Sequence, residues 1–363
     1  MKHVEVYRET GRYAGWPANY GIWSWGNEVV VCFTVGYMKE EISGFHPRDA
    51  NRSFYTVQAR SQDGGESWKV IPMTCKVPGN KSLSADEHVK SDLGIGDTAD
   101  LENTPIDCPG IDFTNPDLAI MCARSGLSDG AESWFYFSLD RCYSWNGPFK
   151  LPGFGLRGIA ARTDYLVADQ NTCTFFLTAA KSNGKEGRVF CAQTTDGGKT
   201  FAFQSMIGEE PDGFDIMPAS LRLPDSRLLV AVRCRGNKPD FAQALNWIDL
   251  YASDNQGVSW QYLNRPVEDT GVGGNPPTLT QLKDGRLAIV YGYRDQPTGI
   301  RNVTSVDNGQ TWSQPIMLRE DGGDHDIGYP RTVERPDGKL VTVYYYNDQP
   351  NGERYIAATI WQP

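Results

Sequence analysis

The chain has 363 residues, a formal net charge of −10, 38 glycines, 22 prolines and 12% aromatic residues. This acidic balance, with no stretch rich in Lys and Arg, argues against a nucleic-acid partner, because phosphate binding needs a basic surface. No apolar run reaches the length that spans a bilayer, so we expect no membrane partner. The many turn-forming residues and the lack of a linker predict a single all-β domain over residues 1–363.

The eight cysteines show neither a C-x-x-C pair nor the spacing of zinc ligands. Several lie in apolar runs such as Val31-Cys32-Phe33, so we expect mostly reduced, buried thiols and no metal site. No cofactor motif is visible, and structural calcium bound by loop carboxylates stays open. The first residues, 1–6, lack the apolar core of a signal peptide. As given, the chain is expected to be cytoplasmic, or periplasmic or secreted if a signal peptide was removed.

The predicted elements begin with a short alternating segment, Val4 to Tyr7, which suits an edge strand added to the last sheet of a ring. Residues 21–28 followed by 29–33 indicate strand, tight turn, strand, and residues 53–60 form a further strand. Residues 76–111 are rich in Asp, Gly, Pro and Ser without alternation. We expect these residues to form an excursion between the first two sheets, near the rim of a site.

The pattern Ser/Thr-x-Asp-x-Gly-x-x-aromatic recurs along the chain. Its copies begin at residues 61, 138, 194, 253 and 305. In the second copy Cys142 replaces the Gly, and in the fourth Asn255 replaces the Asp. The Asp carboxylate is expected to accept backbone N–H groups inside a tight turn, while the Gly takes a positive φ and the aromatic ring packs under the hairpin. A repeat of roughly fifty residues made of strands is typical of propeller blades.

The second half of the chain adds a second kind of turn. The segments 223–228, 282–287 and 335–340 each place a turn containing Asp between two apolar strands, and Asp-Gly is the strongest short hairpin signal. The last of these turns is followed by an apolar run at 355–361 but by no copy of the longer repeat. The pattern therefore predicts five blades with the repeat and one without, which gives a six-bladed β-propeller.

These repeats resemble the Asp-box (BNR repeat) proteins and, more narrowly, the sialidase-like superfamily, which includes the bacterial exo-α-sialidases. The resemblance covers most of the chain and implies a six-bladed propeller. It also implies an exo-acting glycoside hydrolase that removes a terminal acidic sugar with retention, through a Tyr nucleophile. The implied partner is a carbohydrate substrate with an acidic sugar.

Two residues follow from the register of the family around its Asp-containing turns. Counting back from Asp337 as in the family gives Tyr329 as the nucleophile, and counting forward from Asp225 gives Arg233 as a carboxylate-binding residue. Arg301 opens the strand before the last repeat and corresponds to another family Arg. Guanidinium groups bind a carboxylate in a planar, multidentate way that Lys cannot reproduce. A neutral Tyr nucleophile avoids the repulsion that a carboxylate would meet beside an anionic substrate.

The chain departs from the family at three positions. The family's first Arg falls on Trp16, which leaves Arg12 as a nearby substitute. The Glu that activates the Tyr falls on Met217, so Asp215 or Asp326 is expected to take over its role.

The third departure concerns the general acid, whose register falls near Asn51. Asp49 is the predicted acid/base residue because it lies two positions earlier. Other polar side chains at predicted strand ends and loops are candidates for substrate binding: His46, Arg162, Asp164, Arg294 and Arg331.

Two other functions stay open on the sequence. The missing Glu and the missing first Arg favour a uronate-directed polysaccharide lyase or a non-sialic glycosidase, in which His46, His325 or Tyr329 moves a proton. A propeller that binds sugar without catalysis is the third hypothesis. Product analysis separates hydrolase from lyase, because a lyase leaves an unsaturated uronate that absorbs in the ultraviolet.

Overall fold

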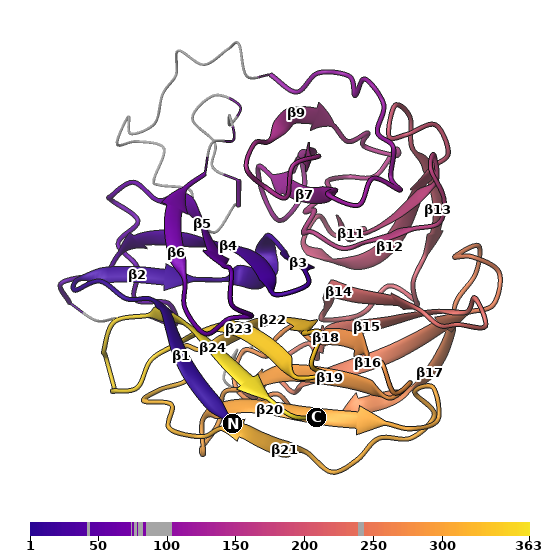
Figure 1. Cartoon of the computed structure of the whole chain (residues 1–363). Coiled ribbons are helices and arrows are strands. Elements are labelled where there is room, and N and C mark those ends of the chain that lie inside the picture. The colour runs from indigo at the N-terminus through magenta and orange to yellow at the C-terminus, as the bar shows by residue number, and fades with distance from the viewer. Residues whose placement is uncertain (42–43, 74, 76–77, 79–82, 85–103, 239–242) are drawn as a thin grey trace.

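The computed structural model describes residues 1–41, 44–73, 75, 78, 83–84, 104–238 and 243–363. Its strands form six antiparallel sheets arranged around a ring, so the fold is a six-bladed β-propeller, as the sequence predicts (Figure 1). The predicted excursion at 76–111 lies largely outside the described residues. Among the described helices, none is long and apolar enough to cross a membrane.

Blades one to five are each built from strands that follow one another along the chain. Blade one contains β2 (Arg12–Gly15), β3 (Ile22–Trp25), β4 (Glu28–Tyr37), β5 (Tyr55–Ser61) and β6 (Lys69–Pro72), with a short 3-10 helix, η1 (Pro17–Asn19), between β2 and β3. The described strands of blade two are β7 (Ala119–Arg124), β8 (Ser133–Ser138) and β9 (Asn146–Lys150). Blade three contains β10 (Tyr165–Val167), β11 (Cys173–Ala180), β12 (Glu186–Thr194) and β13 (Ala202–Met206).

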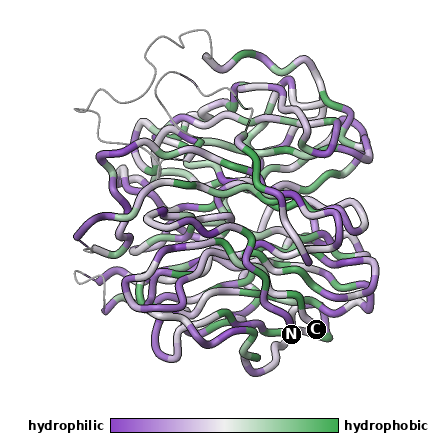
Figure 2. The backbone as a smooth tube through the Cα atoms, turned by 60° about the vertical axis from the view of Figure 1, so that its left-hand side comes forward, coloured by the Kyte–Doolittle hydropathy of each residue, from purple (hydrophilic) through white to green (hydrophobic). Residues whose placement is uncertain are grey.

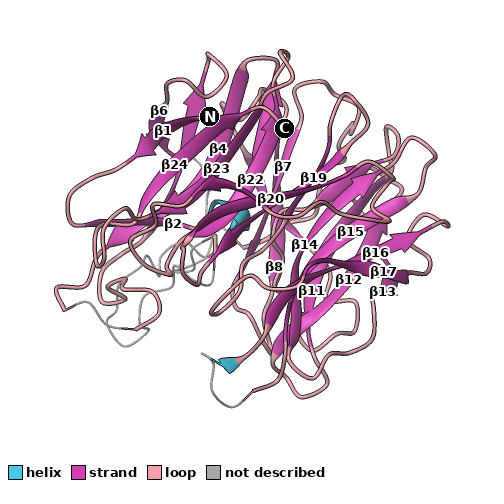
Figure 3. Ribbon diagram, turned by 90° about the horizontal axis from the view of Figure 1, so that it is seen from below, coloured by secondary structure: helices cyan, strands magenta, loops and turns pink. Residues whose placement is uncertain are grey.

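The second half of the ring follows the same plan (Figure 3). Blade four contains β14 (Phe214–Arg222), β15 (Leu228–Arg235), β16 (Asn246–Ser253) and β17 (Gln261–Val267). Blade five contains β18 (Thr278–Gln281), β19 (Leu287–Tyr293), β20 (Gly299–Ser305) and β21 (Ile316–Arg319). Blade six contains β22 (Gly328–Glu334), β23 (Leu340–Tyr346) and β24 (Tyr355–Trp361), and its fourth strand is the N-terminal β1 (Lys2–Tyr7).

The ring closes where the two ends of the chain meet. Strand β1 pairs antiparallel with β24, with Val4 opposite Ala358, and both termini lie at the same edge in Figure 1. This confirms the predicted edge strand, which extends to Lys2. Pairing β1 with β24 covers an edge that would otherwise expose unpaired backbone groups.

The five repeated turns share one hydrogen-bonding pattern. In the last copy, the Asp307 carboxylate accepts the backbone N–H of Thr311 at 2.9 Å, and the Ser305 hydroxyl accepts the N–H of Gly309 at 2.9 Å. The two altered copies keep this pattern, because Cys142 adopts the positive φ of 65° normally left to Gly and the Asn255 side-chain oxygen accepts a backbone N–H at 2.9 Å. The damaged copies therefore still build the same turn.

Hydrophobic residues lie mostly in the interior of the molecule, and hydrophilic residues lie mostly at its outer turns (Figure 2). The resulting core is divided into clusters, most of which lie between neighbouring blades. All eight cysteines are free and seven of them are buried, which confirms the prediction of reduced core thiols. One cluster joins blades one, four and six near the ring centre and contains Trp16, Met217 and Tyr329.

Candidate functional site

Three inner strands are interrupted by a bulky residue in the left-handed region. Trp16 has a φ of 59°, Met217 of 53° and Tyr329 of 51°. The pairing register shifts around Met217 in β14 and around Tyr329 in β22, and Trp16 separates β2 from β3. Side chains larger than Gly rarely adopt this conformation, and such strain gathers at functional sites. The three residues belong to one core cluster near the ring centre, and we call this region the mouth.

Tyr329 is held at the mouth by contacts from three blades. Its hydroxyl accepts a hydrogen bond from Nη1 of Arg233 at 3.0 Å, and its backbone N–H donates to Oδ1 of Asn275 at 2.7 Å. Its ring lies edge-on to Tyr345, with the ring centroids 5.9 Å apart. Tyr329 is 8% exposed, so its hydroxyl is oriented by protein groups.

Arg233 is a buried cation. It lies near the end of β15, is 6% exposed, and donates from Nη2 to the carbonyl of Gly273 at 2.5 Å. Within the described residues it forms no ion pair with a carboxylate, and its Nε has no hydrogen-bond partner. Burying a charge without a counter-ion is costly. The arrangement therefore favours the arrival of an anion beside Tyr329.

A second arginine, Arg235, lies two positions further along β15 and was missed by the sequence analysis. Its guanidinium carbon lies 4.0 Å from the ring centroid of Phe214, and Arg233 lies 5.3 Å from the same centroid. Burial and the neighbouring charge of Arg233 lower the pKa of Arg235 to about 10. The signal in the sequence is the spacing of two, because alternate residues of a strand share one face.

Asp326 is fully buried at the mouth and accepts four side-chain hydrogen bonds. The donors are Nδ1 of His46 at 2.6 Å, the Tyr345 hydroxyl at 2.7 Å, Nε of Arg354 at 2.9 Å and the Tyr13 hydroxyl at 3.1 Å. Burial alone would raise the pKa of Asp326, but His46 and then Arg354 and Arg294 outweigh it and hold this pKa well below its ordinary value. Asp326 is therefore an anion at neutral pH.

His46 reaches Asp326 from the loop that follows β4. Its ring lies edge-on to Trp16 at 5.4 Å and to Phe45 at 4.9 Å between ring centroids, and its side chain stays 27% exposed. It lines a pocket of about 540 Å³ together with Arg48 and Asp49. The structure thus brings Asp326 and His46 together, but no hydrogen bond joins Asp326 to Tyr329 among the described residues.

Asp215, the other candidate base for Tyr329, lies in β14. It contacts the thiol of Cys234, and its own burial together with the charge of Asp249 raises the pKa of Asp215 to about 6. No hydrogen bond between Asp215 and Tyr329 occurs in the part of the chain that the structure describes. Its role as the base stays a prediction.

Arg294 is 2% exposed and directs its guanidinium into the protein. It donates to the carbonyls of Ile327 and Gly274 at 3.0 and 2.9 Å and to the Tyr345 hydroxyl at 2.6 Å. Its guanidinium carbon lies 5.7 Å from the ring centroid of Tyr329. Arg294 therefore lies beside the ring of Tyr329 without contacting its hydroxyl in the described structure.

Three further candidates lie around the ring centre. Arg331 donates to the carbonyls of Ala18 and Thr163, both at 2.6 Å, and so ties together blade six, blade one and the start of blade three. Asp164 accepts from the Ser220 hydroxyl at 2.7 Å. Arg162 is buried and pairs with Glu186 at 2.8 Å.

The remaining predicted arginines have local partners. Arg12 donates to Tyr55 at 3.0 Å and lies 3.9 Å from the ring centroid of Tyr37, on blade one. Arg301 lies 3.4 Å from the ring centroid of Tyr293, on blade five. Among the described residues neither contacts Tyr329 or Arg233, so their part in substrate binding stays a prediction.

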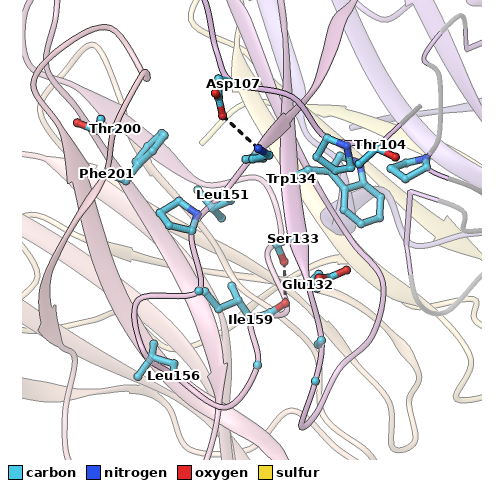
Figure 4. Close-up of a pocket in the computed structure, with 18 of the residues that line it drawn as sticks. Thr104, Asp107, Glu132, Ser133, Trp134, Leu151, Leu156, Ile159, Thr200 and Phe201 are labelled. Carbon is cyan, nitrogen blue, oxygen red and sulfur yellow. Dashed lines mark hydrogen bonds and ion pairs between the residues drawn. The ribbon is translucent and has the colours of Figure 1, made fainter. Parts of the chain in front are cut away.

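A separate pocket of about 950 Å³ lies at blades two and three (Figure 4). Its walls include Trp134, Leu151 and Ile159, and its charged groups include the Lys150–Asp107 ion pair at the surface. None of the predicted site residues lines it. Buried charged side chains and strained backbone occur together at the mouth.

No family model matches the chain, and no curated protein matches it either. Among solved structures, a Dyadobacter fermentans protein of unknown function has a TM-score of 0.70 at 20% identity, covering 99% of this chain and 97% of that one. The GH93 α-L-arabinofuranosidase of Fusarium graminearum in complex with arabinobiose has a TM-score of 0.61 at 14% identity, covering 100% and 98%. Trypanosoma rangeli sialidase in complex with sialic acid has a TM-score of 0.59 at 15% identity, covering 99% of this chain and 58% of the sialidase. The chain therefore shares the six-bladed, sialidase-like propeller fold.

Proposed function

We propose that the chain is an exo-acting glycoside hydrolase that removes a terminal acidic sugar with retention, with Tyr329 as the nucleophile. The observation that carries this proposal is the hydrogen bond between Arg233 and the Tyr329 hydroxyl at the strained mouth of the ring. Arg294 holds the Tyr345 hydroxyl in a similar way, but the Arg233–Tyr329 pair also coincides with a left-handed backbone at Tyr329. This pair suits an oxygen that gains negative charge or attacks beside an anionic substrate.

The chemistry of the two residues is complementary. The guanidinium of Arg233 lacks a carboxylate partner in the described chain, so a sugar carboxylate can provide the missing counter-ion. With the carboxylate bound there, the anomeric carbon of the same sugar comes close to the Tyr329 oxygen. Arg235 adds positive charge on the same face of β15. An acidic sugar fits this site better than a neutral one.

The comparisons support the kind of reaction and not its specificity. Two of the similar propellers are named as glycosidases, one in complex with sialic acid and one in complex with arabinobiose. Those ligands differ in charge, so the fold accommodates both acidic and neutral sugars. The choice of an acidic sugar for this chain depends on Arg233 and Arg235.

The experiment is an assay of the purified chain with 4-methylumbelliferyl glycosides of N-acetylneuraminic acid, glucuronic acid and galacturonic acid, and with the neutral α-L-arabinofuranoside as the control. Cleavage of an acidic glycoside is expected, and NMR of the first product should show a retained anomeric configuration. A fluorinated analogue of the cleaved sugar should label Tyr329, as detected by peptide mass spectrometry. Cleavage of the neutral glycoside alone, or inversion of configuration, would contradict the proposal.

A lyase that acts on a uronate is the second candidate, and one observation favours it. No carboxylate contacts the Tyr329 hydroxyl among the described residues, although the family places a Glu there. In this reaction a base takes the proton next to the uronate carboxylate, and Arg233 stabilises the charge that develops. The product then contains a double bond, so ultraviolet absorbance that appears with cleavage identifies a lyase.

A further inference from the structure

We propose that His46 is the proton-transfer residue of this site and that Asp326 is the residue that positions it. The inference rests on the proposed glycosidase function and assigns to His46 the part that the sequence analysis gave to Asp49. Its basis is the geometry of the His46–Asp326 pair and the place of this pair beside Tyr329.

The contact with Asp326 determines which nitrogen of His46 carries a proton. An ionised carboxylate can only accept hydrogen bonds, so Nδ1 of His46 must donate to Asp326 across their 2.6 Å contact. Nε2 of a neutral His46 is then a free acceptor, and in the charged form it is a donor. A buried carboxylate that fixes the tautomer and orientation of an exposed imidazole is a recurring device of acid–base catalysis.

Asp326 is itself rigid. It is 0% exposed and is fixed by Tyr13, Tyr345 and Arg354, which hold both of its oxygens. Arg354 is in turn held by Asp324, with Nη2 at 2.8 Å from each carboxylate oxygen. Such a network has little freedom to move away when the imidazole changes charge, because its side chains are already ordered in the folded protein.

The loop that carries His46 lies near Tyr329. Phe45, its neighbour in sequence, lies 5.1 Å from the guanidinium carbon of Arg294, and the Tyr329 ring lies 5.7 Å from the same carbon. The imidazole also packs on Trp16, which lies in one core cluster with Tyr329. The loop that carries His46 and the strand that carries Tyr329 therefore meet around one buried cation. His46 keeps an exposed edge there, as a proton donor to a substrate requires.

Asp49 lacks this support. One oxygen of its carboxylate accepts the backbone N–H of Asn51 at 2.9 Å, which closes a turn within its own loop. Within the described residues no buried group orients it toward the mouth. Asp49 and His46 line the same pocket, so the two are directly comparable by mutation.

The reaction balances with one shared proton. As the Tyr329 oxygen attacks the anomeric carbon, its hydroxyl proton passes to Nε2 of His46. The Tyr329–sugar bond forms, the glycosidic C–O bond breaks, and Nε2–H of His46 protonates the departing oxygen to give an alcohol. In the second half, Nε2 takes a proton from water as its oxygen attacks the anomeric carbon. The Tyr329–sugar bond then breaks, and the proton on His46 returns to the Tyr329 oxygen.

The groups that face His46 set the pH response. Asp326 and the Tyr13 hydroxyl contact its ring, with Tyr13 at 3.4 Å from Nδ1, while Arg354 and Arg294 lie behind Asp326. A rate limited by proton transfer through His46 should change its pH profile when His46 is replaced.

The test compares His46→Gln with the matched control Asp49→Asn on two substrates of the same acidic sugar. One substrate carries 4-methylumbelliferone, which leaves readily, and the other carries an alkyl alcohol, which needs protonation. His46→Gln should lower kcat/KM for the alkyl glycoside by roughly 10²–10⁴-fold and much less for the activated one. Asp49→Asn should show no such dependence on the leaving group. Asp326→Asn should move the pH profile of the alkyl reaction, since an amide no longer fixes the imidazole in the same way.

The outcomes separate this inference from the proposed function. Wild-type protein that cleaves no acidic glycoside contradicts the proposed function and the inference with it. Wild-type protein that is active while His46→Gln keeps full activity and an unchanged pH profile overturns the inference alone. A leaving-group-dependent loss in Asp49→Asn instead of His46→Gln assigns the role to Asp49. Melting curves of each variant distinguish these results from a loss of folded protein.

Discussion

Nη1 of Arg233, near the end of β15 in blade four, lies 3.0 Å from the hydroxyl oxygen of Tyr329, at the start of β22 in blade six. This hydrogen bond joins two blades that are not neighbours in the ring, because blade five lies between them. Asn275 of blade five, in turn, fixes the backbone of Tyr329. Three blades thus determine the position of one phenol oxygen, and a change in any of them moves it.

Tyr329→Phe should abolish turnover and preserve sugar binding. Only the hydroxyl is removed, while the edge-on packing on Tyr345 remains. We expect kcat to fall by more than about 10³-fold, as for other nucleophiles. Kd for the product sugar, measured by calorimetry, should change by less than about tenfold. Full activity of this variant on the cleaved substrate would show that Tyr329 is not the nucleophile.

Arg233→Lys should weaken the reaction without unfolding the protein. Lys keeps the charge but loses the planar pair of donors, which we expect to cost about 10–100-fold in kcat/KM, the equivalent of one or two charged hydrogen bonds. Arg301→Lys is the matched comparison, because Arg301 packs on Tyr293 and contacts neither Arg233 nor Tyr329 in the described chain. Equal losses in both variants would support the sequence-based prediction that both bind one anionic group. A large drop in Tm for Arg233→Lys would instead indicate a structural role.

The fold could be predicted because its signals are local. A turn such as that around Asp307 is specified by residues within one short segment, and its five copies mark five of the six blades. Even the pairing of β1 with β24 followed from a short alternating segment once a ring was assumed. The excursion at 76–111 carries no such periodicity, and most of it falls outside the described residues.

The site was harder to predict because its contacts join distant segments. Register from a turn identified Tyr329 and Arg233, which the structure places in contact. The Asp326–His46 pair spans the whole ring in sequence, and nothing local signals it. The sequence pattern around Tyr13 and Tyr345 is typical of strand residues in a core, although their hydroxyls donate hydrogen bonds to Asp326.

Deleting residues 1–10 should lower the melting temperature. The deletion removes β1, unpairs the edge of β24 and exposes apolar surface around Val6, which is 6% exposed in the intact ring. A loss of roughly 4 kcal/mol would lower Tm by about 5 °C in a chain of this size. Lys2→Ala serves as the control, because its ion pair with Glu66 is exposed and should contribute little. An unchanged Tm after the deletion would show that β1 does not stabilise the closed ring.

Asp164 should make the protein less stable as pH rises, which is opposite to the usual effect of a carboxylate. Burial raises the pKa of Asp164 to about 7, and the Ser220 hydroxyl and Arg331 only partly oppose this. Its second carboxylate oxygen is buried and has no hydrogen-bond partner among the residues that the structure describes. The native state therefore holds the proton more tightly than the unfolded state. Stability due to this group is complete below pH 4 and is lost as pH rises to about 7.

Asp164→Asn should remove this dependence, because the amide keeps an oxygen for Ser220 and never ionises. The variant should gain stability relative to the wild type between pH 4 and pH 8, by at most about 4 kcal/mol for a change from 3.8 to about 7. Urea denaturation at each pH gives the free energy of unfolding. Asp307→Asn provides a control of opposite sign, because hydrogen bonds from Thr311 and Ser305 lower the pKa of Asp307 to about 2. That variant should lose stability above pH 4 and differ little from the wild type near pH 2. A stability difference for Asp164→Asn that does not change with pH would mean that Asp164 is ionised in the native protein.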